Sequence, residues 1–498
     1  MSTRFDNRDL PDAGEVTKAE GVRELERRRA LALALGGPER VAAHHMRGRA
    51  TARERIAMLL DENSFVEFGM LAHSDRPEVG ERAAADAAVT GVGTVDGRKV
   101  AVIANDATVF AGTTGRVGAR KQGQLMSLAA RKGYPLVMIG DANGGRMPDL
   151  LGSDFGAPVG GDEGEHFLGI RVMEDRIPRV TVILGNAYGD PVFWAGSSDL
   201  VVMAENCSLA LSGPSLVGSS IGAETTHEEL GGPDMTVRTT GLVGRLEPTE
   251  SDALTAVRRF LGYLPSNATR TAPLAAARPP RTPGENLHAI VPDRGRRGYD
   301  MRNVLDAVVD EDSLLELHAE FGRGLVAGLA RVEGQPVGIL ANQPKHLGGV
   351  LDAPEIQKAT RLVDLCSAFG LPIVFLQDLP GVLVGVDAER RRVAPSLIEL
   401  YTTIARSPVP KVTVVIRKAF GFGYIAMGGP RWASTTPWRG QMPKSGSCRR
   451  PMPCTWSTTS VWSRLGSAAG QMRRARSPPS SRLRCTGRSR RGRRPRKP

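Results

Sequence analysis

The chain has 498 residues, and 66 lysines and arginines against 53 aspartates and glutamates give it a formal net charge of +13 at pH 7. Such a basic excess suggests nucleic-acid binding, but 18 of the basic residues and none of the acidic ones lie in 430–498. Residues 1–429 therefore carry 48 basic and 53 acidic side chains, a mildly acidic balance that excludes nucleic acid as a partner. A chain of this length can form about two to four domains.

Neither a secretory signal nor a membrane span is expected. Residues 1–10 are polar, which does not fit a signal peptide, and no apolar run reaches the length of about 18 residues that a span requires. The only cysteines in residues 1–429 are Cys207 and Cys366, a usage that suits a reducing compartment. We therefore predict a cytoplasmic protein that does not contact membranes.

In chain order, a helical N-terminal arm is expected over residues 1–70. A charged helix over 15–35 ends at a Gly-Gly-Pro sequence, and a second helix begins with Thr51 as N-cap and Glu54 three residues later. Two short strands over 88–105 then meet at Asp96-Gly97, which is a hairpin signal. The arm is expected to pack on another surface and not to perform chemistry.

The chain repeats itself in a fixed register. Matching residues of the first and second halves are separated by a constant difference in residue number, the offset. After a short segment whose length differs between the halves, a second, slightly smaller offset applies. The pairs that share the first offset are Gly97 and Gly334, Asn105 and Asn342, Gly133 and Gly370, Asp141 and Asp378, and Gly144 and Gly381, and those that share the second are Pro178 and Pro410, and Gly189 and Gly421. A general alternation of strands and helices does not explain such a register, so we predict an internal duplication.

The duplicated motif is a buried strand that ends in glycines and leads into an apolar segment, over 177–193 and again over 411–428. Backbone N–H groups at such a turn can stabilise an oxyanion. Residues 1–429 contain no familiar nucleophile motif, phosphate loop or metal-ligand cluster. His227 is expected at a helix start and His346 in a structural loop, while Asp141 and Asp378 are expected to accept local backbone hydrogen bonds.

Domain boundaries follow from composition. A first α/β domain is predicted over 71–263, a Pro- and Ala-rich linker over 264–295, and a second α/β domain over 296–429. The segment 430–498 is rich in Arg, Pro and Ser, holds four of the five tryptophans and three of the five cysteines, and lacks any apolar period. A basic binding tail and a zinc site fit it poorly. Translation in a shifted reading frame fits better, so we expect this segment to be aberrant and disordered and the second domain to be incomplete.

Several longer motifs carry a resemblance to a known family. They are GPERVAAHHMRGRATARERIAMLLDENSFVEFG at 37–69, EELGG at 228–232, FLGYLPSN at 260–267, YDMRNV at 299–304, GILANQP at 338–344, QDLPG at 377–381 and RKAFGFGYIAM at 417–427. Over residues 15–429 the chain resembles the biotin-dependent carboxyltransferases, and in particular the β-subunits of acyl-CoA carboxylases such as propionyl-CoA carboxylase. The resemblance implies two tandem crotonase (ClpP)-like domains.

The resemblance also implies a mechanism and site residues. Carboxybiotin releases CO₂, its ureido nitrogen removes the α-proton of the acyl-CoA, and the enolate attacks CO₂, so two oxyanions need stabilising. By position, the N–H groups of Gly189 and Asp190 match the hole for the thioester. Those of Phe422 and Gly423, after Gly421, match the hole for biotin.

Gly144, Gly145 and Arg146 match the CoA site, and Ile425 borders the acyl chain. Asp190, Phe422 and the sequence Ala-Asn before Gly144 depart from the usual pattern of small residues. No metal ion is implied.

The partners follow from what the sequence lacks. It contains no Met-Lys-Met biotinylation site and no ATP-binding carboxylase region, so a biotin carboxylase and biotin carboxyl carrier subunit is required, and the family implies a homohexamer. The expected reaction is carboxyl transfer to a short-chain acyl-CoA, propionyl-CoA or acetyl-CoA. The alternatives are a crotonase-type hydratase or isomerase acting on CoA thioesters, and an inactive, truncated carboxyltransferase subunit.

Overall fold

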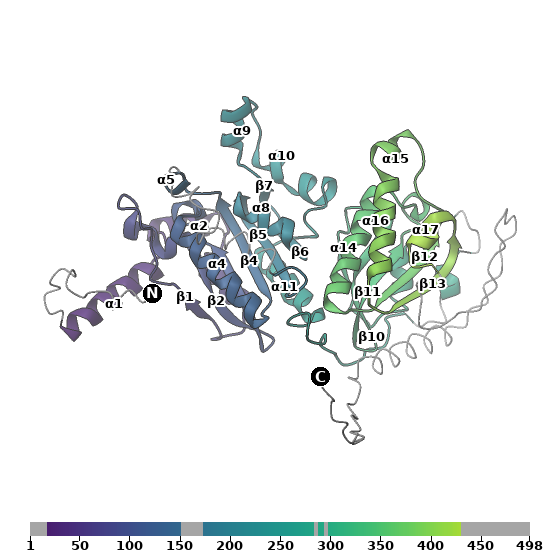
Figure 1. Ribbon diagram of the computed structural model, residues 1–498, viewed down its shortest axis with the longest axis horizontal. Helices are drawn as coiled ribbons and strands as arrows, with labels where there is room; N and C mark the ends of the chain where they lie inside the picture. The colour runs from purple at the N-terminus through teal and green to yellow at the C-terminus, as the bar shows by residue number, and fades with distance from the viewer. Residues whose placement is uncertain (1–16, 151–172, 283–286, 293–296, 430–498) are drawn as a thin grey trace, which may run out of the picture.

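The computed structural model describes residues 17–150, 173–282, 287–292 and 297–429. These residues form two α/β units, which lie side by side in Figure 1, the first in purple to teal and the second in green. The expectations for 430–498 lie outside the described residues. Within the described ranges, no helix combines the length and the apolar character that a membrane crossing needs.

The arm contains α1 (Lys18–Leu33), α2 (Pro38–Met46) and α3 (Ala52–Leu59). The predicted capping box of α3 is confirmed: the N–H of Glu54 donates to the hydroxyl of Thr51 at 3.4 Å, and the N–H of Thr51 donates to the carboxylate of Glu54 at 2.7 Å. Helix α1 extends away from the first unit (Figure 1). Helix α3 packs on β2, β3 and α11 of that unit, so this part of the arm belongs to its core.

The first sheet has the strand order β1-β2-β3-β4-β5-β6-β8, and β7 pairs with the end of β5. Strands β1 to β3 are antiparallel, while β3, β4, β5, β6 and β8 run parallel. Helices α4 and α8 cover one face, and α3 and α11 cover the other. The strands are β1 (Val66–Phe68), β2 (Ala88–Val95), β3 (Arg98–Asn105), β4 (Leu136–Asn143), β5 (Arg179–Tyr188), β6 (Leu200–Ala204), β7 (Ser208–Ala210) and β8 (Arg245–Glu247), and the helices α4 (Arg116–Lys132), α5 (Met147–Leu150), α8 (Asp190–Ser197), α9 (Pro214–Ile221), α10 (His227–Gly231) and α11 (Glu250–Tyr263).

The second sheet repeats the first five strands in the order β9-β10-β11-β12-β13. Among the described residues it ends at β13, the counterpart of β5, and has no counterparts of β6, β7 or β8. Most of β13 is consequently half-buried, whereas β5 is almost wholly buried. The strands are β9 (Leu315–Leu317), β10 (Leu325–Val332), β11 (Gln335–Asn342), β12 (Ile373–Leu379) and β13 (Lys411–Ala419), and the helices α12 (Leu287–Ile290), α13 (Met301–Leu305), α14 (Ala353–Phe369), α15 (Val386–Arg390), α16 (Val393–Arg406) and α17 (Gly421–Ala426).

The predicted duplication is visible in details of the backbone. Residues Phe110–Gly112 form a turn with three successive positive φ angles, and Leu347–Gly349, which match them at the first offset, form the same turn. An isolated parallel bridge joins Thr114 to Gly145 and, at the same offset, Leu351 to Val382. Left-handed backbone is costly for residues other than glycine, so its recurrence at one offset shows two copies of one fold.

The repeat begins earlier than the sequence indicated. Helix α3 and strand β1 correspond to α13 and β9 at a slightly larger offset, which is the same for both elements. In both units an aspartate at this offset accepts two backbone N–H bonds from the following hairpin turn: Asp61 from residues 96 and 97, and Asp310 from residues 333 and 334. Strand β1 lies within the residues expected to be an arm, yet it pairs with β2 as part of the sheet.

Each unit also buries one lysine at the matched position. The Nζ of Lys121 donates to the carbonyl of Gly69 at 3.3 Å, directly after β1. The Nζ of Lys358 donates to the carbonyl of His318 at 2.9 Å, directly after β9. Burial lowers the pKa of each ammonium to about 8. Both lysines therefore fix the start of the sheet to the long helix that covers it.

Candidate active site

The first predicted turn joins β5 to α8 through Gly189. Its φ of 72° is in the left-handed region, and a Cβ atom there would lie 2.9 Å from the Cα of Gly144. Only glycine fits this approach, which brings the turn after β5 against the turn after β4. The next residue, Asp190, is the first residue of α8, where a backbone N–H group has no acceptor within the helix.

The two predicted N–H groups of this turn are not equivalent. The N–H of Gly189 donates to the carbonyl of Leu211, just beyond β7, at 3.2 Å. The expectation of an open N–H pair is therefore wrong for Gly189 and remains for Asp190. Sequence could not show this bond, because β7 reaches β5 only through the folded sheet.

The predicted CoA-site residues follow β4. Gly144 has a φ of 79°, and Gly145 forms the parallel bridge to Thr114. Arg146 points inward and is buried: its guanidinium donates to the carboxylate of Asp86 at 2.6 Å and to the carbonyl of Thr113 at 3.1 Å. As placed, Arg146 fixes the glycine turn and does not face solvent.

A tyrosine that the sequence did not single out lies next to this turn and contacts His227, which was expected only at a helix start. The hydroxyl of Tyr188 forms a hydrogen bond with Nδ1 of His227, and the two rings stack with centroids 5.8 Å apart. His227 begins α10, as predicted, behind a capping box from Thr226. Burial raises the pKa of the Tyr188 phenol. The available signal was that Tyr188 directly precedes Gly189.

The second predicted turn joins β13 to α17. Gly421 has a φ of 65°, and a Cβ at Gly423 would lie 2.8 Å from Cδ2 of Leu379. The backbone therefore requires glycine at 421, whereas at 423 a Cβ would clash only with the end of the Leu379 side chain. The ring of Phe422 lies against that of Tyr401 on α16, with centroids 5.6 Å apart, and Phe422 and Ile425 are each 39% exposed. The N–H groups of Phe422 and Gly423 belong to the first turn of a helix and have no intrahelical acceptor.

Asp141 and Asp378 do not make the local backbone bonds predicted for them. The carboxylate of Asp141 accepts from Arg55 of α3 at 2.9 Å, and that of Asp378 accepts from Arg417 at 3.0 Å and from the hydroxyl of Tyr299 at 2.9 Å. Both predictions are wrong for the same reason. The hydrogen-bond donors to the two carboxylates are arginine and tyrosine side chains from distant parts of the chain, which the local sequence does not indicate.

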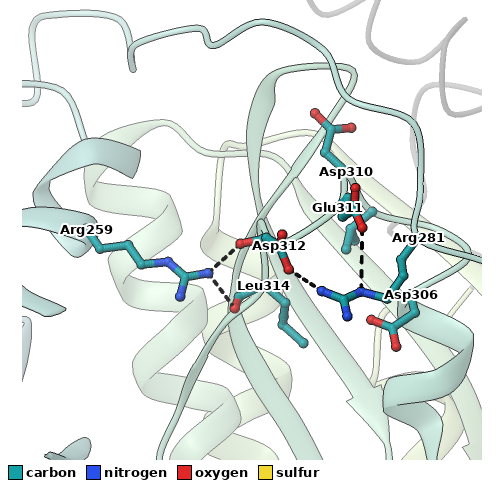
Figure 2. A pocket seen from close by; sticks show the side chains of 8 residues that line it. Arg259, Arg281, Asp306, Asp310, Glu311, Asp312 and Leu314 are labelled. Carbon is teal, nitrogen blue, oxygen red and sulfur yellow. Dashed lines mark hydrogen bonds and ion pairs between the residues drawn. The ribbon is translucent and has the colours of Figure 1, made fainter.

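A separate pocket of about 250 Å³ lies between α11, the linker and the start of the second unit. Figure 2 shows Arg259 donating to the carbonyls of Asp312 and Leu314, at 2.7 and 2.9 Å, and Arg281 paired with the carboxylate of Asp312. These contacts attach the linker and the first unit to the second. Among the described residues no cluster of three His, Cys, Asp or Glu side chains is suited to a metal ion.

Comparisons with known proteins agree with this geometry. A family model described as a carboxyl transferase domain matches residues 43–438. The β5 subunit of the biotin-dependent acetyl-/propionyl-coenzyme A carboxylase of Mycobacterium tuberculosis is 37% identical over 424 residues, which cover 83% of this chain and 76% of that protein. The propionyl-CoA carboxylase β chain of Saccharopolyspora erythraea is 36% identical over 425 residues, covering 83% and 77%.

Among solved structures, transcarboxylase 12S with methylmalonyl-coenzyme A and methylmalonic acid bound is similar, with a TM-score of 0.77 and 32% identity over 82% of this chain and 80% of that one. Two α/β units, each with a glycine turn at a strand end, define a crotonase-like carboxyltransferase. The chain belongs to the carboxyl transferase domain family and is a biotin-dependent carboxyltransferase. The predicted family and fold are confirmed, and the hydratase alternative is not supported.

Proposed function

We propose that the protein transfers a carboxyl group from carboxybiotin to the α-carbon of a short-chain acyl-CoA, with propionyl-CoA or acetyl-CoA as substrate. The observation that carries the proposal is the pair of glycine turns that occupy matching positions at the ends of β5 and β13. The reaction develops negative charge on a thioester oxygen and on a ureido oxygen, and each turn offers N–H groups to one of them. The names of the relatives support these substrates.

The first turn is the proposed thioester site. We assign the N–H of Asp190 as one donor, since it begins α8 and the helix dipole favours negative charge there. Gly189 shapes the turn, and its own N–H donates to the carbonyl of Leu211. Its approach to Gly144 brings the backbone nitrogen of Gly145 within 3.9 Å of the position that a Cβ of residue 189 would occupy. The N–H of Gly145 is therefore the proposed second donor, with Arg146 fixing its position.

The second turn is the proposed biotin site, formed by Gly421, Phe422 and Gly423. Its residues fit an uncharged, partly apolar ring system, because the two N–H groups lie at a helix start where Phe422 is exposed and Gly423 is buried, and the Phe422 side chain rests on Tyr401. When bound, carboxybiotin supplies the carboxyl group and the base that removes the α-proton. The half-exposed Ile425 side chain is proposed to border the acyl chain.

We further propose that activity requires assembly. A biotin carboxylase and biotin carboxyl carrier subunit would supply carboxybiotin, and a homohexamer would bring together first and second units of different chains. Transcarboxylase 12S, described as a hexamer, supports that assembly. The proposed domains are 71–263, extended to include α3 and β1, and 296–429, joined by the linker 264–295. Location in the cytoplasm stays a prediction from cysteine usage.

The test uses the purified chain mixed with a biotinylated carrier that has been loaded with ¹⁴C-carboxyl groups. We expect the label to appear in methylmalonyl-CoA when propionyl-CoA is added, or in malonyl-CoA with acetyl-CoA. A Gly189→Val variant is the control, because its side chain would collide with Gly144. Hydration of an enoyl-CoA without label transfer would overturn the proposal. If the purified chain assembled normally but transferred no label to either acyl-CoA, the result would support the inactive, truncated alternative.

A further inference from the structure

Each proposed site stands directly after a β-bulge that contains a buried aspartate. In the first unit Gly140 pairs with Ile183 and Ala142 pairs with Ala187, so three residues of β5 face Asp141 alone. In the second unit Gln377 pairs with Val415 and Leu379 pairs with Ala419, which leaves three residues of β13 opposite Asp378. The two bulges have the same length and occupy matching positions in the repeat.

The bulge sets the direction of the strand ends that carry the glycine turns. After Asp141 the pairing resumes for two residues, ending with Asn143 and Tyr188, and the chain then reaches Gly144 and Gly189. After Asp378 it resumes at Leu379, the residue whose side chain limits the space at Gly423. Because a bulge bends its strand and increases the twist, a change at either aspartate will move the N–H groups beyond it.

The two aspartates are neutralised from different places. In β13 the middle residue of the bulge is Arg417, whose guanidinium lies 3.0 Å from the Asp378 carboxylate, and Lys418 follows at 3.5 Å. The matched residue of β5 is Gly185, where a Cβ atom would lie 2.0 Å from Oδ1 of Asp141. The space that an arginine occupies in the second unit is therefore taken by the aspartate in the first.

The cations of the first unit come instead from the arm, where Arg49 lies 3.9 Å from the Asp141 carboxylate and Arg55 lies closer. Arg55 of α3 is fully buried and donates to the Asp141 carboxylate at 2.9 Å, to the carbonyl of Leu184 in the bulge at 2.7 Å, and to Glu250 of α11 at 2.6 Å. The residue matching Arg55 in the second unit is Val304, which is apolar. Removing one member of such a buried pair leaves an uncompensated charge and is strongly destabilising.

We propose that Asp141 and Asp378 are positioning residues, one for each oxyanion site, and that their separate cation partners make the two sites independent of each other. The inference rests on the proposed function. It means that the arm, through Arg55, controls only the thioester site, whereas Arg417 and Tyr299 control only the biotin site.

Two partial reactions separate the sites. Methylmalonyl-CoA that loses CO₂ forms an enolate, which takes a proton from water to give propionyl-CoA, and this needs only the thioester site. Free carboxybiotin that loses CO₂ and takes up a proton gives biotin, and this needs only the ureido site. Both rates are measured as CO₂ release by the intact, assembled protein.

Asp141→Asn is expected to slow the first partial reaction by about 10- to 100-fold and to change the second by less than about twofold, and Asp378→Asn is expected to do the reverse. Arg55→Lys and Arg417→Lys keep the positive charge. Arg55→Lys should slow only the reaction at the thioester site of Asp141, and Arg417→Lys only the reaction at the biotin site of Asp378. Asp310→Asn is the matched control, because it removes an equally buried carboxylate that caps a distant hairpin turn. Its unfolding temperature should fall while both partial reactions continue.

Equal slowing of both partial reactions by either variant would overturn the inference, as would unchanged rates in folded Asp141→Asn and Asp378→Asn proteins. Where an asparagine variant does not fold, the lysine variants decide, since only a positioning role predicts a loss confined to one site. Absence of both partial reactions in the unaltered protein would instead refute the proposed function.

Discussion

Residue 190 places a backbone N–H group and a carboxylate in the same small region at the start of α8. The N–H would stabilise a thioester oxyanion, whereas the negative side chain would oppose it. We therefore predict that Asp190→Asn raises kcat/KM for the acyl-CoA by about three- to tenfold, because the N–H is kept and the charge is removed. Steady-state carboxylation assays measure this, with the KM for the biotinylated carrier as an internal control. A slower asparagine variant would contradict the prediction and assign the carboxylate a positive role.

At the scale of elements, the capping box of α3 supports a buried ion pair as well as a helix. Thr51 and Glu54 fix the start of the helix that presents Arg55 to Asp141. Thr51→Ala is expected to lower the free energy of unfolding by about 1 kcal/mol and to reduce the rate at the thioester site. Chemical denaturation and the methylmalonyl-CoA partial reaction measure the two effects.

The matched control is Thr17→Ala, which removes a similar capping box from α1, a helix that extends away from the first unit (Figure 1). That variant should also lose stability, but its helix carries no partner of Asp141. If both variants slowed the thioester site alike, a general loss of stability would explain the result, and the specific role of α3 would be contradicted.

Local elements and the duplication could be predicted from the sequence because their causes are local or periodic. The Thr51 cap, the Asp96-Gly97 turn and the constant offsets between the two halves all follow from short-range residue chemistry. Long-range polar contacts could not be predicted. Arg55 donates to Asp141 from a distant part of the chain. The carbonyl of Leu211 accepts the N–H of Gly189 only because β7 pairs with β5. Arg146, expected at the CoA site, turned inward because Asp86 lies beneath it.

At the scale of the whole molecule, the two units meet at His318, whose N–H donates to the carbonyl of Gly244 in the first unit at 2.7 Å. Its ring lines a cavity of about 730 Å³ between β6 and α14, together with Arg361 and Asp364. Burial, followed by the charges of Arg361 and Lys358, lowers the pKa of His318 to about 3. The folded protein therefore keeps this imidazole neutral, whereas the unfolded chain protonates it below pH 6.5.

The sign of the pH effect follows from that difference. The unfolded state binds the extra proton between pH 6.5 and about 3, so His318 costs the protein stability as the pH falls through this range. Asp364, with its pKa raised to about 6 by burial, acts in the opposite direction. The free energy of unfolding should therefore decrease between about pH 6.5 and 4 by on the order of 3 kcal/mol less in His318→Gln than in the unaltered protein. Urea denaturation at several pH values measures it, with His73→Gln as the control, and an unchanged slope would be the contrary result.

The second sheet raises the last question at this scale, because β13 is an edge strand in the part of the chain that the structure describes. Its counterpart β5 pairs with β6 and β7, and the β7 segment supplies the carbonyl that holds Gly189. We predict that resequencing the gene across codons 427–432 will reveal a missing or extra base, since the apolar period is lost and Arg, Pro and Ser dominate from that point on. The chain read in the restored frame should then contain strands equivalent to β6 and β7, which fix Gly421 as β7 fixes Gly189.

Restoration of the frame is expected to act mainly on the biotin site, because β13 and α17 would gain the neighbours that β5 and α8 already have. Release of CO₂ from free carboxybiotin should rise by about tenfold or more, while decarboxylation of methylmalonyl-CoA at the complete first unit should change little. Native mass spectrometry of both chains would show whether hexamers form only in the restored frame. If the given chain and the chain in the restored frame released CO₂ from carboxybiotin at equal rates, the shifted frame would not be a functional defect. A biotin site beside an open edge strand would then work as well as one beside a covered strand.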